Sequence, residues 1–433
     1  LGIDIAEDTI RRYVDGTYFS HIIGYTGKIS SEELKSLNEE TSQGGDDEGR
    51  YEMNDTVGKS GIEKVMETYL QGEKGRETIY VDNLGKEIDS EGRVEPVAGN
   101  DVYLSLDADL QEAIYNILEQ SIAGLLLEKI ENIKEFNLAP NAKTSGIRIP
   151  IDDVYFALFN NNVINLDHLA SPQAEENEKA VYEAFRQKKE KVWNWLTQEL
   201  YQDRTPYNQL KEEYQSYESY IVTNLLINDT RVLKVDTSDE VYRTWTEEET
   251  ISLSEFLEYA IAQNWVDVSR LDMDTQYADS SEVFDRLAEY ISQELEKTSF
   301  YKKLYKYMIR DNSISGKQVC LVLIEQQIVS VSEEQRAALE NGSVSAYQFM
   351  RKLIENLQIT PAQLALDPFS GSCVVVDPNT GEVLALVSYP SYDNNKLANG
   401  IDAEYYASLQ NDLSLPLWDY ATQMRSAPGS TYK

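Results

Sequence analysis

The middle of the chain carries a long series of helical patterns. From Asp109 onwards, apolar residues recur at the three- and four-residue spacing of an amphipathic helix, at Leu110, Ile114, Ile117, Leu118 and Ile122. Further apolar stripes with this spacing lie within residues 182–196, 256–261 and 287–295. Stripes of this kind are typical of core helices rather than of cofactor sites. The pattern therefore predicts a mostly helical region over residues 128–368, where no motif indicates catalysis.

The sequence before this region mixes helical, strand and loop patterns. Residues 1–37 contain apolar runs of an ordered segment, whereas the glycine-rich, acidic stretch 38–50 predicts an exposed loop. A short helical pattern at 62–70 is followed by strand patterns at 78–81 and 101–106. This part of the chain is predicted to be α+β.

The sequence after the helical region switches to strand patterns. Apolar runs at 373–376 and 383–387 enclose Asp-Pro-Asn-Thr-Gly, which are the residue types of a hairpin turn. We therefore interpret Asp377 as a turn residue and not as a catalytic acid. Residues 402–413 predict a helix and a loop.

Length and charge narrow the possible functions. A chain of 433 residues exceeds one ordinary core and suggests two or three domains. Its formal net charge of −36 argues against nucleic-acid partners, whose phosphates select for Lys and Arg. The sequence contains no run of about eighteen apolar residues and therefore predicts no transmembrane helix within it. The sequence starts at Leu1 rather than Met, so this result does not exclude an anchor upstream.

Cysteine and histidine are too scarce to predict a zinc site. Cys320 and Cys373 both lie in apolar runs and are predicted to be buried, inert thiols. A disulfide between them is the alternative. The histidines are His21 and His168. With two residues of each type, we expect no zinc site.

A serine and a lysine three positions apart close the sequence. Ser430 and Lys433 follow Pro428-Gly429, a turn signal that predicts a helix start at the serine. On a helix such residues share a face, about 5–6 Å apart at Cβ, so the lysine amine could accept the serine proton. Ser299 and Lys302 have the same spacing but no preceding turn, and we interpret that pair as a solvated helix face.

Other motif-like stretches are interpreted as chance. Gly58-Lys59-Ser60 lacks the earlier glycine and the preceding strand of a phosphate-binding loop. Lys143-Thr144-Ser145-Gly146 and Ser36-Leu37-Asn38 faintly match elements of penicillin-recognising enzymes, but they precede the serine motif instead of following it.

Five blocks, taken together and in order, closely resemble the class B penicillin-binding proteins, which are monofunctional peptidoglycan D,D-transpeptidases. Each block alone is a weak signal, but their order makes the combination specific. The blocks are Arg12-Tyr13 with His21-Ile22-Ile23-Gly24-Tyr25-Thr26-Gly27, Gly58-Lys59-Ser60-Gly61 with Leu70-Gln71-Gly72, Leu104-Ser105-Leu106-Asp107, Val375-Val376-Asp377-Pro378-Asn379-Thr380-Gly381, and Ala427-Pro428-Gly429-Ser430-Thr431-Tyr432-Lys433.

The resemblance implies an α+β architecture with three parts. Residues 1–103 would form an elongated, non-catalytic pedestal of the dimerisation type. Residues 104–127 and 369–433 would form the N-terminal part of a transpeptidase domain, an incomplete α/β/α fold. The helical region 128–368 would be an insert of unknown role, since the family usually has only a short helix and loop there.

The resemblance also implies a chemistry. Ser430 would be the acyl nucleophile and Lys433 its general base, acting without metal or organic cofactor on stem peptides ending in D-Ala-D-Ala. β-Lactams would acylate the same serine. We further expect membrane-embedded glycosyltransferase partners of the elongation or division machinery. The protein would lie on the extracytoplasmic face of the cell membrane, anchored by an N-terminal transmembrane helix outside this sequence.

Two departures from the family qualify this expectation. Asp419-Tyr420-Ala421 stands where the family often has Asn-Arg-Ala. The Ser-x-Asn and Lys-Thr-Gly elements that should follow Ser430 are not in this sequence, so we expect the chain alone not to be acylated by a penicillin. The alternative is a non-catalytic scaffold of the wall-synthesis complex. A β-lactam sensor or serine β-lactamase shares the Ser-x-x-Lys spacing, but the blocks before residue 111 disfavour both.

Overall fold

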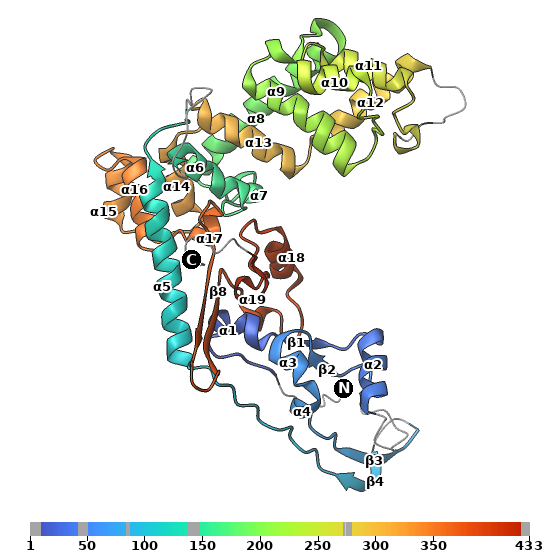
Figure 1. The fold of residues 1–433 in the computed structure, drawn as a ribbon, viewed down its shortest axis with the longest axis vertical. Coiled ribbons are helices and arrows are strands. Elements are labelled where there is room, and N and C mark those ends of the chain that lie inside the picture. The colour runs from blue at the N-terminus through green and yellow to red at the C-terminus, as the bar shows by residue number, and fades with distance from the viewer. Residues whose placement is uncertain are drawn as a thin grey trace. The chain divides into compact units, whose positions relative to one another are not determined.

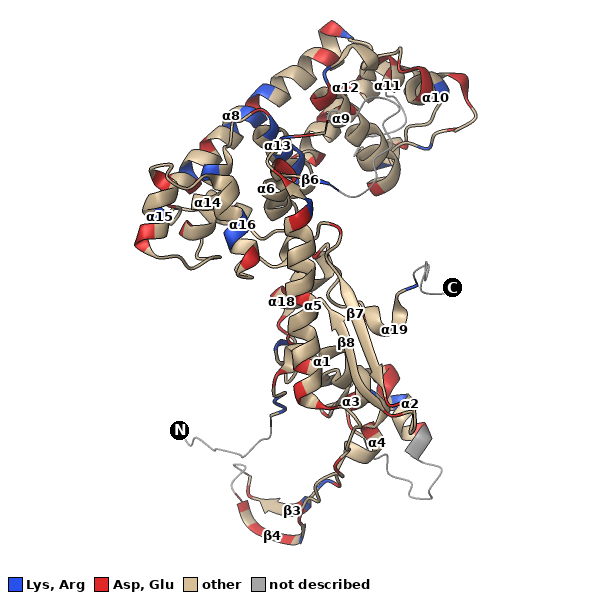
Figure 2. Ribbon diagram, turned by 60° about the vertical axis from the view of Figure 1, so that its left-hand side comes forward, with Lys and Arg blue, Asp and Glu red and all other residues tan. Residues whose placement is uncertain are grey.

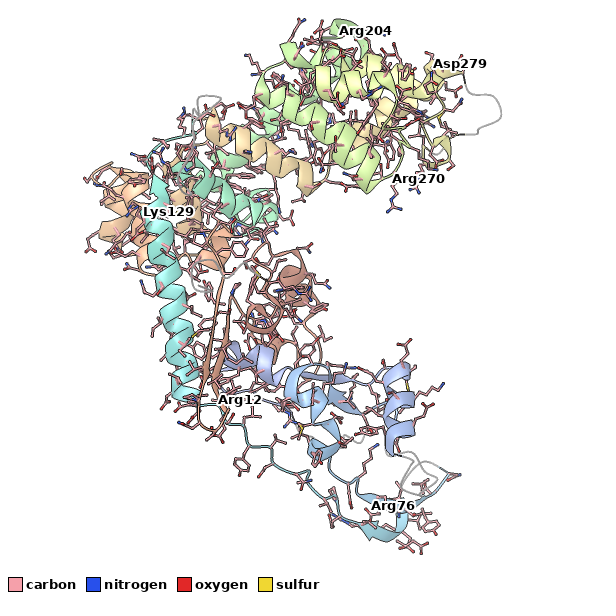
Figure 3. All side chains as sticks on the ribbon, viewed as in Figure 1. Arg12, Arg76, Lys129, Arg204, Arg270 and Asp279 are labelled. Atoms are coloured by element: carbon pink, nitrogen blue, oxygen red, sulfur yellow. The ribbon has the colours of Figure 1, made fainter. Side chains whose placement is uncertain are left out.

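A computed structural model describes residues 10–41, 51–83, 87–136, 148–271, 273 and 279–425 (Figure 1). The chain divides into two compact units. Unit 1 comprises Leu1–Lys129 and Leu353–Lys433, and unit 2 comprises Ile130–Lys352. The chain passes from unit 1 to unit 2 after Lys129, the last residue of a long helix (Figure 3). It returns to unit 1 at Leu353.

The first part of unit 1 is built from short elements around a small apolar core. Ile29, Tyr51 and Val57 form this core, and Leu34 and Leu37 pack against it. Strands β1 and β2 pair antiparallel, with Thr26 opposite Gly58. The helix predicted at 62–70 is confirmed, with a break at Met66. The elements are α1 (Gly16–Ile23), β1 (Thr26–Lys28), α2 (Ser31–Thr41), β2 (Thr56–Gly58), α3 (Gly61–Val65) and α4 (Glu67–Leu70).

A solvent-exposed hairpin follows. Strands β3 (Arg76–Val81) and β4 (Glu87–Val94) pair antiparallel, and every residue of both strands is exposed. The strand predicted at 78–81 is therefore confirmed. Most of the predicted acidic loop at 38–50 lies outside the described residues, but residues 38–41 belong to helix α2.

The strand predicted at 101–106 is wrong. This segment is extended but forms no ladder. It touches the edge of the later hairpin through the Ser105 hydroxyl, which donates to the Val383 carbonyl at 2.8 Å, and the Asp107 N–H, which donates to the Leu384 carbonyl at 2.9 Å.

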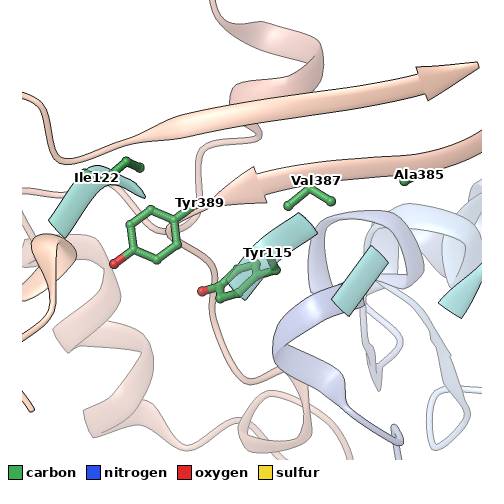
Figure 4. Close-up of a cluster of buried hydrophobic side chains, with 5 residues drawn as sticks. All are labelled: Tyr115, Ile122, Ala385, Val387 and Tyr389. Carbon is green, nitrogen blue, oxygen red and sulfur yellow. The ribbon is translucent and has the colours of Figure 1, made fainter. Parts of the chain in front are cut away.

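The second part of unit 1 packs a helix against a hairpin. Helix α5 (Ala108–Lys129) lies along strands β7 (Gly371–Val376) and β8 (Val383–Tyr389), which pair antiparallel from Gly371 opposite Tyr389 to Val376 opposite Val383. Figure 4 shows the shared core of Tyr115, Ile122, Ala385, Val387 and Tyr389. Both predicted strands and the predicted helix start are confirmed.

Asp377 is confirmed as a turn residue. Its Oδ1 atom accepts hydrogen bonds from the backbone N–H groups of Asn379, at 2.7 Å, and Thr380, at 3.3 Å. These two donors stabilise the charged form and lower the pKa of the carboxyl. Both hydrogen bonds hold Asp377 in the turn, which agrees with its interpretation as a turn residue.

Short elements complete unit 1. The helix predicted at 402–413 is observed as α18. The elements are α17 (Pro361–Leu364), the 3₁₀ turn η7 (Asn394–Lys396), α18 (Ala403–Asn411) and α19 (Tyr420–Gln423).

Unit 2 is helical, as the apolar stripes predict. Phe185, Val192 and Leu196 of the first stripe are buried, and so are Phe256 and Leu287 of the others. Its α-helices are α6 (Ile151–Asn160), α7 (Leu166–Leu169), α8 (Glu176–Gln198), α9 (Glu212–Ser219), α10 (Glu240–Arg243), α11 (Leu253–Ala262), α12 (Ser280–Glu294), α13 (Thr298–Arg310), α14 (Gly316–Glu325), α15 (Glu333–Glu340) and α16 (Ala346–Glu355), within which unit 2 ends.

Several helices of unit 2 are joined by the same kind of corner. A residue with positive φ ends the helix, and an apolar residue two positions later donates its N–H to the carbonyl six residues back. The apolar residue is Ile164, Ile314 or Val344, and the corresponding N–H···O distance is 3.0 Å in each case. A polar N-cap residue then starts the next helix. Local sequence therefore fixes each corner independently of the others.

The basic residues of unit 2 are concentrated on two helices. In unit 2, Lys and Arg gather on α8 and α13 (Figure 2), while acidic residues occur throughout.

Cys320 is buried, as predicted, and burial raises the pKa of its thiol. Cys373 is only half-buried, although it lies on the same face of β7 as Val375, which packs against the core, so the prediction of burial is wrong there. The described helices include none that combines the length and apolarity needed to span a bilayer.

Candidate functional site

The nucleophile pair Ser430 and Lys433 lies outside the described residues, which end at Arg425. The structure does describe the chain that leads to this pair. We call residues 412–423 the approach segment. Its contacts decide how the polypeptide before Ser430 is held.

The second Ser-x-x-Lys pair is described and is not assembled as a site. The Ser299 hydroxyl shares a 2.8 Å hydrogen bond with the Tyr220 hydroxyl, and Lys302 Nζ donates to the Asn160 carbonyl at 2.7 Å. Lys302 is half-buried, and burial lowers the pKa of its amine. The expectation of a solvated helix face is therefore correct for Ser299, which is exposed, and wrong for Lys302.

Asp419 starts helix α19 and fixes it to the hairpin. Its Oδ1 atom accepts from the Ala421 N–H at 3.1 Å and from the Ser388 hydroxyl at 2.5 Å. The Ser388 hydroxyl also accepts from the Ala421 N–H at 2.9 Å, and the Thr422 hydroxyl donates to Asp419 Oδ2. Asp is one of the preferred N-cap residues. The aspartate that departs from the family's usual Asn-Arg-Ala thus serves as a helix cap joined to β8.

A second turn fixes the start of the approach segment. Asp412 Oδ1 accepts from the Ser414 N–H at 2.8 Å and from its hydroxyl at 2.7 Å. The Tyr420 hydroxyl donates a hydrogen bond to the Ser414 carbonyl at 2.9 Å, and Ser414 is fully buried. Leu415 has a positive φ of 52°, which turns the chain towards α19. These contacts within the segment join its start to Tyr420 of α19.

His21 of helix α1 connects the first part of unit 1 to this loop. Its Nε2 atom lies 3.0 Å from the carbonyl oxygen of Pro416, and its Nδ1 atom lies 3.5 Å from the Ser391 hydroxyl. The imidazole packs edge-on against Tyr392 with centroids 5.3 Å apart. Burial lowers the pKa of His21, although the charge of Asp419 and the carbonyl contact act in the opposite direction.

Three asparagines attach the 394–399 turn to the residues before and after α1. Asn395 accepts from the Tyr13 N–H at 2.8 Å and donates to its carbonyl at 3.0 Å. Asn399 does the same to Arg11, with both distances 2.7 Å. Asn394 donates to the Gly24 carbonyl at 2.8 Å. Each side-chain amide thus replaces a strand partner for the backbone. Arg12 itself is exposed (Figure 3).

The glycines of the first two blocks are required by close packing. A Cβ at Gly16 would lie 2.3 Å from Asn394 Oδ1, and a Cβ at Gly24 would lie 2.0 Å from the Ser60 carbonyl. Gly58 donates its N–H to Glu67 at 2.7 Å, and Lys59 pairs with Glu33 at 2.5 Å. The Gly-Lys-Ser stretch is therefore a packing turn, in agreement with the rejection of a phosphate-binding loop.

Sequence reasoning did not find the roles of His21, Ser388 and the three asparagines. His21 belongs to a block of the resemblance, but its partner Pro416 lies 395 positions further along the sequence. Nothing in the local pattern around Ser388 distinguishes it from any other strand serine. The signal that could have found these residues is the pairing of distant segments.

Two family profiles match the chain. Residues 1–104 match the penicillin-binding protein dimerisation domain, and residues 371–433 match the penicillin-binding protein transpeptidase domain. Together with the relatives described below, these matches support a class B penicillin-binding protein. The second match contains Ser430 and Lys433.

The relatives are peptidoglycan D,D-transpeptidases named MrdA. The chain is 37% identical over 123 residues to that of Acinetobacter baumannii, covering 28% of this chain and 16% of the relative. It is 33% identical over 126 residues to that of Escherichia coli K12, covering 29% and 19%. It is 50% identical over 68 residues to that of Haemophilus influenzae, covering 16% and 10%. The matched stretches thus span less than a fifth of these relatives.

Proposed function

We propose that the gene product containing this chain is a peptidoglycan D,D-transpeptidase that works through a serine acyl-enzyme. The observation that carries this proposal is the position of the Ser430-x-x-Lys433 motif inside the transpeptidase match, downstream of a dimerisation-domain match. The packing of α5 against β7 and β8, and the approach segment fixed to β8, support it.

The reaction would begin at the Ser430 hydroxyl. Lys433 takes the hydroxyl proton while Oγ attacks the carbonyl of the penultimate D-Ala of a donor stem peptide. The peptide C–N bond breaks, the terminal D-Ala leaves with a proton, and an ester to Ser430 remains. The amine of an acceptor stem peptide then attacks this ester, which forms the cross-link and restores the serine.

The site has two further requirements. Lys433 must be at least partly neutral to act as a base, which burial or neighbouring cationic groups would favour. The backbone N–H of Ser430 would donate to the developing oxyanion, an arrangement that a helix start provides. β-Lactams, whose ring carbonyl replaces the peptide carbonyl, would acylate the same oxygen. No metal or organic cofactor takes part in this scheme.

Location and partners follow from the same proposal. The substrate is cell-wall material, so the protein would act on the extracytoplasmic face of the cell membrane with a transmembrane anchor. Its partners would be membrane-embedded glycosyltransferases of wall elongation or division. Unit 2, which has its own core, favours a second candidate function as a scaffold that binds such partners without catalysis.

A labelling experiment separates the two functions. Three forms of the gene product would be incubated with a fluorescent penicillin: the wild type, Ser430→Ala and Ser299→Ala. The Ser299→Ala variant is the matched control, because it alters the same spacing elsewhere. We expect stoichiometric labelling that Ser430→Ala abolishes and Ser299→Ala preserves. An unlabelled wild type, or equal labelling of Ser430→Ala, would favour the scaffold.

A further inference from the structure

The approach segment is held by residues from two different domain matches. Ser388, in the transpeptidase match, binds the Asp419 cap of α19 at 2.5 Å. His21, in the dimerisation match, binds the Pro416 carbonyl at 3.0 Å. Both contacts lie within unit 1. The dimerisation part therefore touches the chain that leads to Ser430 directly.

The hydrogen-bond partners fix the tautomer of His21. A carbonyl oxygen only accepts, so the proton must be on Nε2, which donates to Pro416. Nδ1 is then an acceptor for the Ser391 hydroxyl. Ser391 Oγ also lies 2.5 Å from Ser20 Oγ, one residue before His21. The ring is thus oriented from both nitrogens.

Packing restricts the ring further. Tyr392 lies edge-on to the imidazole, with an interplanar angle of 84°, and its hydroxyl donates to the Ser20 carbonyl at 3.2 Å. Side chains whose rotamers are fixed by packing and by outer hydrogen bonds hold a site more precisely than free ones. His21 is oriented in this way although it carries no role in the proposed chemistry.

The Pro416 carbonyl is a suitable point of attachment. Pro416 is buried, and a buried carbonyl without a partner is costly. Loss of the His21 N–H would therefore displace the segment or leave the carbonyl unpaired.

We propose that His21 is a positioning residue, which holds the approach segment so that Ser430 is presented for acylation. The inference rests on the proposed function of Ser430. Gln423, the last residue of α19, precedes Ser430 by only seven positions in the sequence, and the inference is that a shift of α19 reaches the nucleophile. A misplaced nucleophile lowers the rate of the acylation step more than it lowers ligand affinity.

The test compares three variants of the gene product. His21→Phe keeps a planar ring against Tyr392 but removes the Nε2 donor. His21→Gln keeps a nitrogen donor at a similar distance from the backbone. His168→Phe applies the same change to the chain's other histidine, in unit 2, and is the matched control. Thermal unfolding curves identify any variant that is not folded.

Two measurements are made on each variant. Hydrogen exchange follows the backbone amides of the approach segment, among them the Ala421 N–H. Stopped-flow labelling with a fluorescent penicillin gives the acylation rate constant and the dissociation constant separately. Loss of one hydrogen bond to a buried carbonyl predicts about fivefold to tenfold slower acylation for His21→Phe. We expect faster exchange, an unchanged dissociation constant, and recovery of most of the rate in His21→Gln.

Three results for the His21 variants would overturn the inference. They are wild-type exchange in His21→Phe, faster exchange with an unchanged acylation rate, and a His21→Gln variant as slow as His21→Phe. Equal slowing by His168→Phe would also contradict it, since the effect would then be nonspecific. A wild type that no penicillin acylates would instead refute the proposed function, and the exchange data would still decide whether His21 fixes the segment.

Discussion

Glu218 is a buried carboxyl that should make unit 2 less stable as the pH rises. It lies near the end of α9 and is fully buried. Neither side-chain oxygen has a hydrogen-bond partner among the described residues. Burial raises the pKa of Glu218 to about 9, and the charge of the buried Glu199 adds to this effect. At neutral pH the folded state therefore holds a proton that the unfolded chain has lost.

The sign and size of the effect follow from linkage. Because the folded pKa is raised, the stability that the protonated group provides is fully present below about pH 4.5 and is lost as the pH rises towards about 9. Within this window the free energy of unfolding falls by about 1.4 kcal/mol per pH unit. At pH 7.5, three units above the unfolded pKa, Glu218 therefore costs unit 2 about 4 kcal/mol.

The substitution Glu218→Gln removes the titration and keeps the size of the side chain. We expect the variant to be more stable than wild type by about 4 kcal/mol at pH 7.5, which is about 8–16 °C in melting temperature for a unit of this size. The two proteins should converge near pH 4.5. Glu212→Gln, an exposed carboxylate on the same helix, is the matched control and should change stability by less than about 1 kcal/mol at either pH.

Tryptophan fluorescence during urea unfolding is a suitable assay. Four of the five tryptophans, at positions 193, 195, 245 and 265, lie in unit 2, so the signal reports mainly on that unit. The stability difference between Glu218→Gln and wild type would be measured from pH 5 to pH 9. A difference that does not grow with pH would refute the reasoning, because it would show that the buried carboxyl is not protonated in the folded state.

Three further predictions concern packing and the approach segment. Gly16→Ala should lower the melting temperature by several degrees in calorimetry, because its Cβ would lie 2.3 Å from Asn394 Oδ1; a wild-type melting temperature would contradict this. Asp419→Asn retains a good N-cap and should cost less than about 1 kcal/mol, whereas Asp419→Ala should cost about 1–2 kcal/mol in urea unfolding, and equal losses would show that capping is not its role. Iodoacetamide should alkylate the half-buried Cys373 in the folded protein and Cys320 only after unfolding, and mass spectrometry that finds equal modification of both would refute this.

The local elements of this chain could be predicted from its sequence because their signals are local. The apolar spacing along α5, α8 and α12 and the Asp-Pro-Asn-Thr-Gly turn at Asp377 each determine structure within a few residues. The five blocks likewise resemble the family that the two profiles support, and the order of the blocks along the chain makes that resemblance specific.

The failures occurred where distant contacts decide the outcome. Residues 101–106 alternate like a strand but find only a side-chain contact and one backbone hydrogen bond at the edge of β8. Cys373 lies in an apolar run and on the same face of β7 as Val375, which packs against the core, yet Cys373 is only half-buried. The attachment of His21 to Pro416 depends on the fold bringing both segments together, which no periodicity reports.

The central claim is that Ser430 is the acyl nucleophile. The most direct measurement is mass spectrometry of the gene product after incubation with benzylpenicillin, followed by peptide mapping of the adduct. The account predicts one adduct with the mass of the intact penicillin, located on Ser430, with the Ser299 peptide unmodified. An adduct on any other residue, or none under conditions where the protein is folded, would contradict it.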